Sequence, residues 1–209
     1  MRLTPKLIRQ LQAAAQKYGD DAFFGVRSKD HEFFVCNWVF GLRFAPGEIM
    51  NCPHVRALED ETDRICEQSD TKRDIVRHMF SRSWMDILVG TGIYQDAHLV
   101  KLHDDEHAIF ADRGWSAIPF ETDGGRRFYV KEAYFDVAEE SIGNGITPTI
   151  FRPINSSAYP GEYRPMLFQD EDGEVRGLVY TISEENLRHP VDPMQKWRQE
   201  VEEIMPELQ

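Results

Sequence analysis

The spacing of the apolar residues changes near Gly92, and this change constrains the fold more than any motif in the chain. Before it, apolar residues recur every three or four positions, which is the spacing of one face of an α-helix. After it, short runs alternate between apolar and polar residues, which is typical of strands with one buried face. A helix-rich first half followed by strands predicts an α+β fold with a mostly antiparallel sheet in the second half.

Helices are predicted in the first half and at the C-terminal end. The first has the clearest boundaries, because Thr4 can cap its start and Gly19 can end it. The last is predicted to close the fold as a C-terminal helix. The predicted helices are residues 4–18, 54–68, 71–89 and 193–207.

Strands are predicted from aromatic and β-branched runs bounded by turn residues. The clearest hairpin has Asp172 and Gly173 at its turn, where glycine tolerates a positive φ. Residues 41–53 are expected to form a loop. Because proline cannot donate to a strand ladder, residues 146–154, with Pro148 and Pro153, are expected at a sheet edge or in a loop. The predicted strands are residues 22–27, 31–40, 97–102, 108–112 and 126–137, followed by the hairpin at 163–182.

The chain is long enough for one compact domain over residues 1–209, with a possible sub-boundary near residues 90–95. No sequence repeat of 20–50 residues and no low-complexity linker is present. No apolar run reaches the roughly 18 residues that a membrane span needs, so no membrane association is expected. The three widely spaced cysteines do not form a disulfide framework, and the N-terminus lacks the apolar core of a secretion signal. These features predict a cytoplasmic protein.

Charge is distributed unevenly along the chain. Residues 1–90 hold 13 Lys and Arg and 13 Asp and Glu, whereas residues 91–209 hold 11 and 23, so the formal net charge of −12 comes from the later part. This surplus argues against direct nucleic acid binding, which depends on clustered basic residues. It favours a protein partner with a basic surface. The candidate interaction residues are Asp104, Asp105, Glu106, Glu139, Glu140, Asp170, Glu171, Asp172 and Glu174.

A possible metal site lies at residues 103–107. His103, Asp105 and His107 have side chains that suit zinc or iron, and a metal-dependent hydrolase is therefore the alternative function. On a helix the two histidines would share one face. The flanking runs are typical of strands, however, so the segment is expected to be a solvated hairpin tip.

A second possible metal set consists of Cys36, Cys52, His54 and Cys66. It lacks the two close ligand pairs of a typical structural zinc site. Buried free cysteines also behave as small apolar residues, so zinc binding stays an open alternative. No nucleophile motif, phosphate-binding loop or dinucleotide fingerprint is present. No cofactor is therefore predicted, and an enzyme is the less favoured class.

Together these features predict a non-catalytic acidic interaction protein, such as an inhibitor, an adaptor or an assembly subunit. Docking is expected through a negatively charged face of the C-terminal half. Such a face can present carboxylates to a basic or nucleic-acid-binding partner as a nucleic acid mimic.

Overall fold

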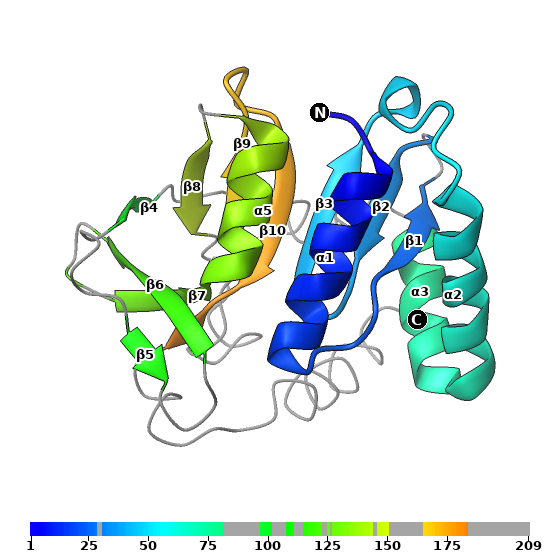
Figure 1. Ribbon diagram of the computed structural model, residues 1–209, viewed down its shortest axis with the longest axis horizontal. Coiled ribbons are helices and arrows are strands. Elements are labelled where there is room, and N and C mark those ends of the chain that lie inside the picture. Colours follow the sequence, from blue (N-terminus) through cyan, green and yellow to red (C-terminus); the bar gives the residue numbers. More distant parts are fainter. Residues whose placement is uncertain are drawn as a thin grey trace.

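A computed structural model describes much of the chain and contains helices together with one extended sheet (Figure 1). The described residues are 1–28, 31–81, 97–101, 108–110, 115–122, 125, 127–143, 146–150 and 165–183. The helices are α1 (Pro5–Tyr18), the short 3₁₀ helix η1 (Pro46–Glu48), α2 (Val55–Gln68), α3 (Asp70–Ser81) and α5 (Glu132–Ile142). The predicted closing helix at residues 193–207 lies outside the described residues.

The strands form one sheet in which their spatial order differs from their order in the sequence. Every described pairing is antiparallel. Their order is β1-β2-β3-β10-β9-β8-β4-β6-β7-β11, with β5 also paired to β6. The predicted α+β class with an antiparallel sheet is therefore confirmed. The strands are β1 (Phe24–Arg27), β2 (Phe33–Cys36), β3 (Phe40–Phe44), β4 (Ala97–Lys101), β5 (Ala108–Phe110), β6 (Trp115–Thr122), β7 (Arg127–Lys131), β8 (Thr147–Ile150), β9 (Pro165–Gln169), β10 (Val175–Tyr180) and β11 (Ile182–Ser183).

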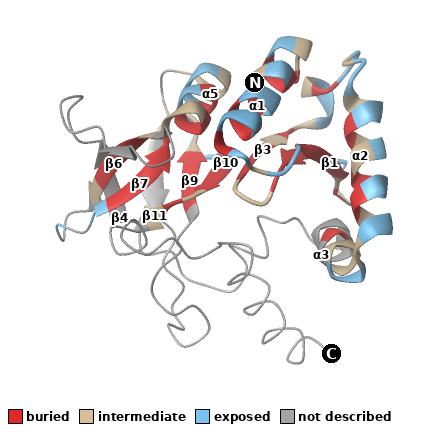
Figure 2. Ribbon diagram, turned by 60° about the horizontal axis from the view of Figure 1, so that its bottom comes forward, coloured by how far each residue is buried: buried red, intermediate tan, exposed pale blue. Residues whose placement is uncertain are grey.

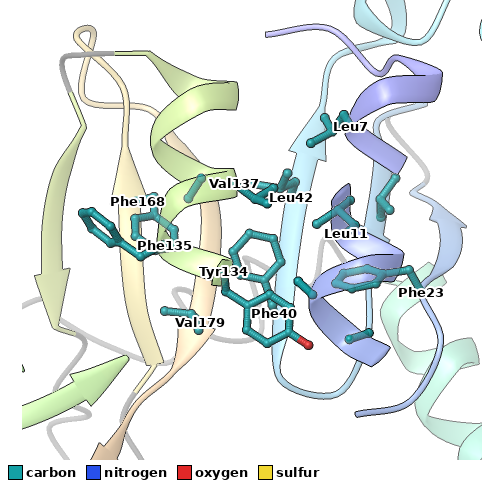
Figure 3. Close-up of a cluster of buried hydrophobic side chains, with 14 of the residues drawn as sticks. Leu7, Leu11, Phe23, Phe40, Leu42, Tyr134, Phe135, Val137, Phe168 and Val179 are labelled. Atoms are coloured by element: carbon teal, nitrogen blue, oxygen red, sulfur yellow. The ribbon is translucent and has the colours of Figure 1, made fainter. Parts of the chain in front are cut away.

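The core lies on both faces of the sheet, because alternate strand residues point to opposite sides. On β2, Phe33 and Val35 join the larger cluster beneath α1 and α5, while Phe34 and Cys36 join a smaller cluster with α2 and α3. Figure 3 shows the larger cluster, in which the ring of Phe40 stacks on that of Tyr134 with centroids 5.0 Å apart. Burial of both sheet faces explains why β2 is apolar throughout.

The order helix-strand-strand-strand occurs twice, as α1-β1-β2-β3 and as α5-β8-β9-β10. In the sheet the two units meet at their last strands, β3 and β10. The order β1-β2-β3-β10-β9-β8 therefore runs from the first to the third strand of one unit and then from the third back to the first strand of the other. Since β3 and β10 are antiparallel, an approximate two-fold axis passes between them and relates α1 to α5. The two helices accordingly lie side by side and antiparallel on one face of the sheet (Figure 1).

The strand β1 ends the sheet on one side, and α2 packs against it. The Thr62 hydroxyl of α2 donates to the carbonyl oxygen of Gly25 at 2.6 Å. A Cβ at Gly25 would come within 2.4 Å of the Phe33 ring and 2.9 Å of Leu58. Glycine at this position therefore allows the helix to approach the strand closely.

The expected strand at residues 126–137 is wrong in its second part. The strand β7 stops at Lys131, and α5 begins at the next residue. No side chain caps the start of α5 locally. Instead, the backbone N–H of Ala133 donates to the Tyr18 hydroxyl, 115 residues away in sequence, at 3.0 Å. Local sequence therefore offers no sign of this helix start.

The expected hairpin of residues 97–102 with 108–112 is also wrong. Both β4 and β5 pair with β6, a strand that was not predicted. Pro119 interrupts the pattern of β6, but it falls between the residues that pair with β5 and those that pair with β4. Its missing N–H therefore costs no described pairing on that side.

Two further boundaries differ from expectation. The strand β8 lies inside the sheet, between β9 and β4, rather than at an edge, and its Pro148 precedes the two residues that pair with β4. The run at residues 31–40 is two strands, because the Asn37 side chain accepts hydrogen bonds from the backbone of Val39 and Phe40 and forms a turn. The following strand β3 occupies part of the expected loop at 41–53.

Candidate interaction surface

The predicted interaction residues that the structure describes lie at one end of the molecule. The β9–β10 turn and the last turn of α5 are both at the upper end in Figure 1. We call this set the acidic end. It consists of Glu139, Glu140, Asp170, Glu171, Asp172 and Glu174.

The β9–β10 turn, predicted from Asp172 and Gly173, is held by Asp170. The Asp170 carboxylate accepts hydrogen bonds from the backbone N–H of Asp172 at 3.1 Å and of Glu174 at 3.0 Å. Gly173 has a φ of 79°, which is the left-handed conformation expected of it. Because the turn is hydrogen-bonded internally, the exposed side chains of Glu171 and Asp172 project from an ordered backbone.

Asp170 also contacts Arg176 of β10, whose Nε donates to Asp170 Oδ2 at 2.7 Å. Partial burial raises the pKa of Asp170, but the hydrogen bonds from Arg176 and from the backbone of Glu174, with the positive charge of Arg176, outweigh it. The pKa of Asp170 therefore lies below its ordinary value. This carboxylate supports the turn and is not available to a partner.

Basic side chains neutralise two further members of the acidic end. Glu140 pairs with Lys6 of α1 and accepts a hydrogen bond from Gln10 at 2.6 Å. The hydrogen bonds from Lys6 and Gln10 hold the pKa of Glu140 below its ordinary value. Glu174 lies 3.7 Å from Arg43. Within the described part of the chain, Glu139, Glu171 and Asp172 make no ion pair, so their charges face solvent.

The predicted metal ligands His103, Asp105 and His107 lie outside the described residues, as do Asp104 and Glu106 of the candidate interaction set.

The cysteines of the second possible metal set lie on different faces of the sheet. Cys36 and Cys66 belong to the smaller core cluster, whereas Cys52 packs against the larger one. Burial raises the pKa of the Cys36 thiol, which disfavours the thiolate that zinc requires. His54 is exposed. Within the described ranges, which include all four residues, no three His, Cys, Asp or Glu side chains are placed to hold a metal ion.

A buried polar cluster, not predicted from the sequence, joins the C-terminal end of α1 to the N-terminal end of α5. Lys131 Nζ lies 2.6 and 2.8 Å from the two carboxylate oxygens of Asp20, and their side chains are only 9% and 12% exposed. The Tyr134 hydroxyl donates to Asp20 Oδ2 at 2.6 Å and accepts from the Asn37 amide at 3.1 Å. The Lys131 ammonium also lies 5.1 Å from the ring centroid of Tyr18, a cation–π contact.

The two tyrosines of this cluster hold their protons strongly. Burial raises the pKa of Tyr134 most, and the charge of Asp20 and its hydrogen bond raise it further. Burial also raises the pKa of Tyr18, and the nearby carboxylates of Glu132, Asp136 and Asp20 add to the effect. Each polar group in the cluster has a partner, so the arrangement fits a structural link between the two units. No spacing rule relates residues 20, 37, 131 and 134, so the sequence carried no signal for it.

Neither models of known families, nor curated proteins, nor solved structures match this chain. Among the helices that the structure describes, none has the length and apolar character to cross a lipid bilayer.

Proposed function

We propose that the protein is a non-catalytic interaction protein that docks onto a basic partner surface through its acidic end. The observation that carries the proposal is the position of Glu171 and Asp172. They project, exposed and outside any described ion pair, from a turn that Asp170 holds in place. Because the turn backbone is already held by hydrogen bonds, binding through these carboxylates orders little further backbone, which favours docking.

The neighbouring charges support the same proposal. Glu139 adds a third exposed carboxylate at this end of the molecule, and the negative net charge of −12 attracts a basic partner at longer range. Lys6, Arg43 and Arg176 lie among these residues, but each is engaged by a carboxylate. Phosphate groups would be repelled here, so a protein with a basic surface is the proposed partner rather than a nucleic acid.

The test compares proteins captured by three forms of the full chain. The turn variant Glu171→Gln/Asp172→Asn removes both exposed turn charges. The control Asp63→Asn/Glu67→Gln removes the same charges from the exposed face of α2, on the far side of the molecule. We expect a partner that binds the wild type and the control at about 0.15 M salt, does not bind the turn variant, and dissociates near 1 M salt as charges are screened. Capture of the same proteins by all three forms would refute docking through the turn.

A further inference from the structure

The outward faces of α1 and α5 carry opposite charges. Within Pro5–Tyr18 there is no acidic residue, and Lys6, Arg9 and Lys17 are exposed. Within Glu132–Ile142 there is no basic residue, and Asp136, Glu139 and Glu140 are exposed. Figure 2 shows the exposed residues of both helices on the side that faces away from the sheet. The approximate two-fold axis thus relates two helices of similar backbone and opposite charge. We call their outward surface the helical face.

Only part of this charge is balanced within the molecule. Lys6 and Glu140 form an ion pair between the two helices at one end. Arg9 and Glu139 make no ion pair with any described residue, and Lys17 contacts the ring of Tyr18 instead, with Nζ 5.4 Å from the ring centroid. The helical face therefore has a basic stripe on α1, formed by Lys6, Arg9 and Lys17, beside an acidic stripe on α5, formed by Asp136, Glu139 and Glu140.

We propose that the helical face is an interface between two copies of this chain. Consider a two-fold axis in the plane of the face, parallel to the helices and midway between them. It places α1 of one copy over α5 of the other, and the reverse, so each basic stripe meets one acidic stripe and the same contact occurs twice. Arg9 is then level with the stretch between Asp136 and Glu139 of the second copy. Ala13, exposed near the middle of α1, leaves room for close approach.

A second copy fits this face better than a nucleic acid does. A phosphate backbone attracted to Arg9 or Lys17 would also lie against the carboxylates of α5 and be repelled by them. A second copy matches both signs of charge, and opposite potentials across an interface fix its register. The alternative occupant is a foreign protein with the same two stripes. Sedimentation of the purified chain distinguishes the two, because only self-association gives a dimer without another protein.

The size of the face sets the strength of the dimer. A helix of 14 residues, such as α1, is about 21 Å long and about 10 Å wide, so two helices offer roughly 400 Å² per copy. A stable interface buries about 800 Å² per partner. We therefore infer a weak dimer, populated at high protein concentration and low salt, and dissociated as salt screens the charges.

The test uses charge reversal and sedimentation of the full chain. The α1 variant is Arg9→Glu/Lys17→Glu, and the α5 variant is Asp136→Lys/Glu139→Lys. Each is expected to be monomeric alone, because its two facing helices then have like charges. An equimolar mixture is expected to form dimers again, since every contact pairs opposite charges. The turn variant Glu171→Gln/Asp172→Asn, whose changes lie outside the helical face, is expected to dimerise like the wild type.

Several outcomes would overturn the proposal. They are a wild type that stays monomeric at low salt and high concentration, reversal variants that still dimerise alone, and a mixture that does not reassociate. Circular dichroism checks that each reversal variant is folded. If one is not, Arg9→Gln and Glu139→Gln replace the reversals, and each must lower the dimer fraction at a given concentration. The dimer does not depend on the acidic end having a partner, so either proposal can fail alone.

Discussion

At the scale of single residues, Asp20 is the carboxylate on which the buried polar cluster depends. It accepts hydrogen bonds from Lys131, the last residue of β7, and from Tyr134 of α5 in the second unit, while Asp20 itself follows α1 of the first unit. We expect Asp20→Asn to lower the free energy of unfolding by about 3–5 kcal/mol, because it removes the carboxylate that the buried Lys131 ammonium contacts at 2.6 and 2.8 Å. Urea denaturation measures this loss.

The control for that change is the double variant Asp20→Asn/Lys131→Met, which removes both charges. It should be more stable than Asp20→Asn alone, since the buried ammonium is then removed together with its carboxylate partner. Equal stability of the single and double variants would contradict a penalty for burying the Lys131 charge without the Asp20 carboxylate.

Tyr134 gives the protein a pH dependence at the alkaline end. Because the pKa of Tyr134 is raised in the folded state, the unfolded chain releases this proton first as pH rises past about 10. The free energy of unfolding should therefore be unaffected by this group at neutral pH. Above pH 10 it should fall by up to about 1.4 kcal/mol per pH unit for each such tyrosine.

Tyr134→Phe tests this dependence, because it removes the proton but keeps the ring that stacks on Phe40. Its unfolding free energy should fall less steeply between about pH 10 and 11 than that of the wild type. Tyr18, whose pKa is also raised, would contribute to the slope that is left. Identical slopes for the two proteins would contradict the assignment to Tyr134.

At the scale of elements, α1 illustrates a helix that local sequence specifies fully. The Thr4 hydroxyl accepts from the backbone N–H of Leu7 at 3.2 Å, and Gly19 ends the helix with a φ of 69°. Thr4→Ala should cost about 1 kcal/mol in thermal or urea unfolding, whereas Thr4→Ser, which keeps the acceptor, should cost little. A loss as large for serine as for alanine would mean that the methyl contact, not the cap, matters.

The elements that the sequence did not predict have a common cause. The start of α5 is completed by the Tyr18 hydroxyl rather than by a local cap, and Pro119 in β6 is tolerated because of where β4 and β5 end. Both features depend on residues distant in the chain, so the local spacing of apolar residues cannot predict them. The hairpin at Asp172 and Gly173 was predictable because its turn depends only on neighbouring residues.

At the scale of the whole molecule, the duplication of the helix-strand-strand-strand unit could not be found from the sequence. The two units are separated by a long insertion that contains η1, α2, α3 and the strands from β4 to β7. They also carry opposite charges on their helices, so neither spacing nor composition repeats. The acidic end was foreseen only as a set of residues. Its convergence at one end, and the neutralisation of Glu140 by Lys6, depend on how the two units meet, whereas Asp170 is neutralised by Arg176 of its own hairpin.

The contact between α2 and β1 affects how copies of this chain can meet. An uncovered terminal strand invites another molecule to extend the sheet, which leads toward aggregation. Here the Thr62 hydroxyl donates a hydrogen bond to the Gly25 carbonyl oxygen of that strand, and α2, packed against β1, blocks the approach of another chain. At this side of the sheet, association must use side chains on helices rather than backbone amides. Recognition can then be tuned by surface substitutions without endangering the fold.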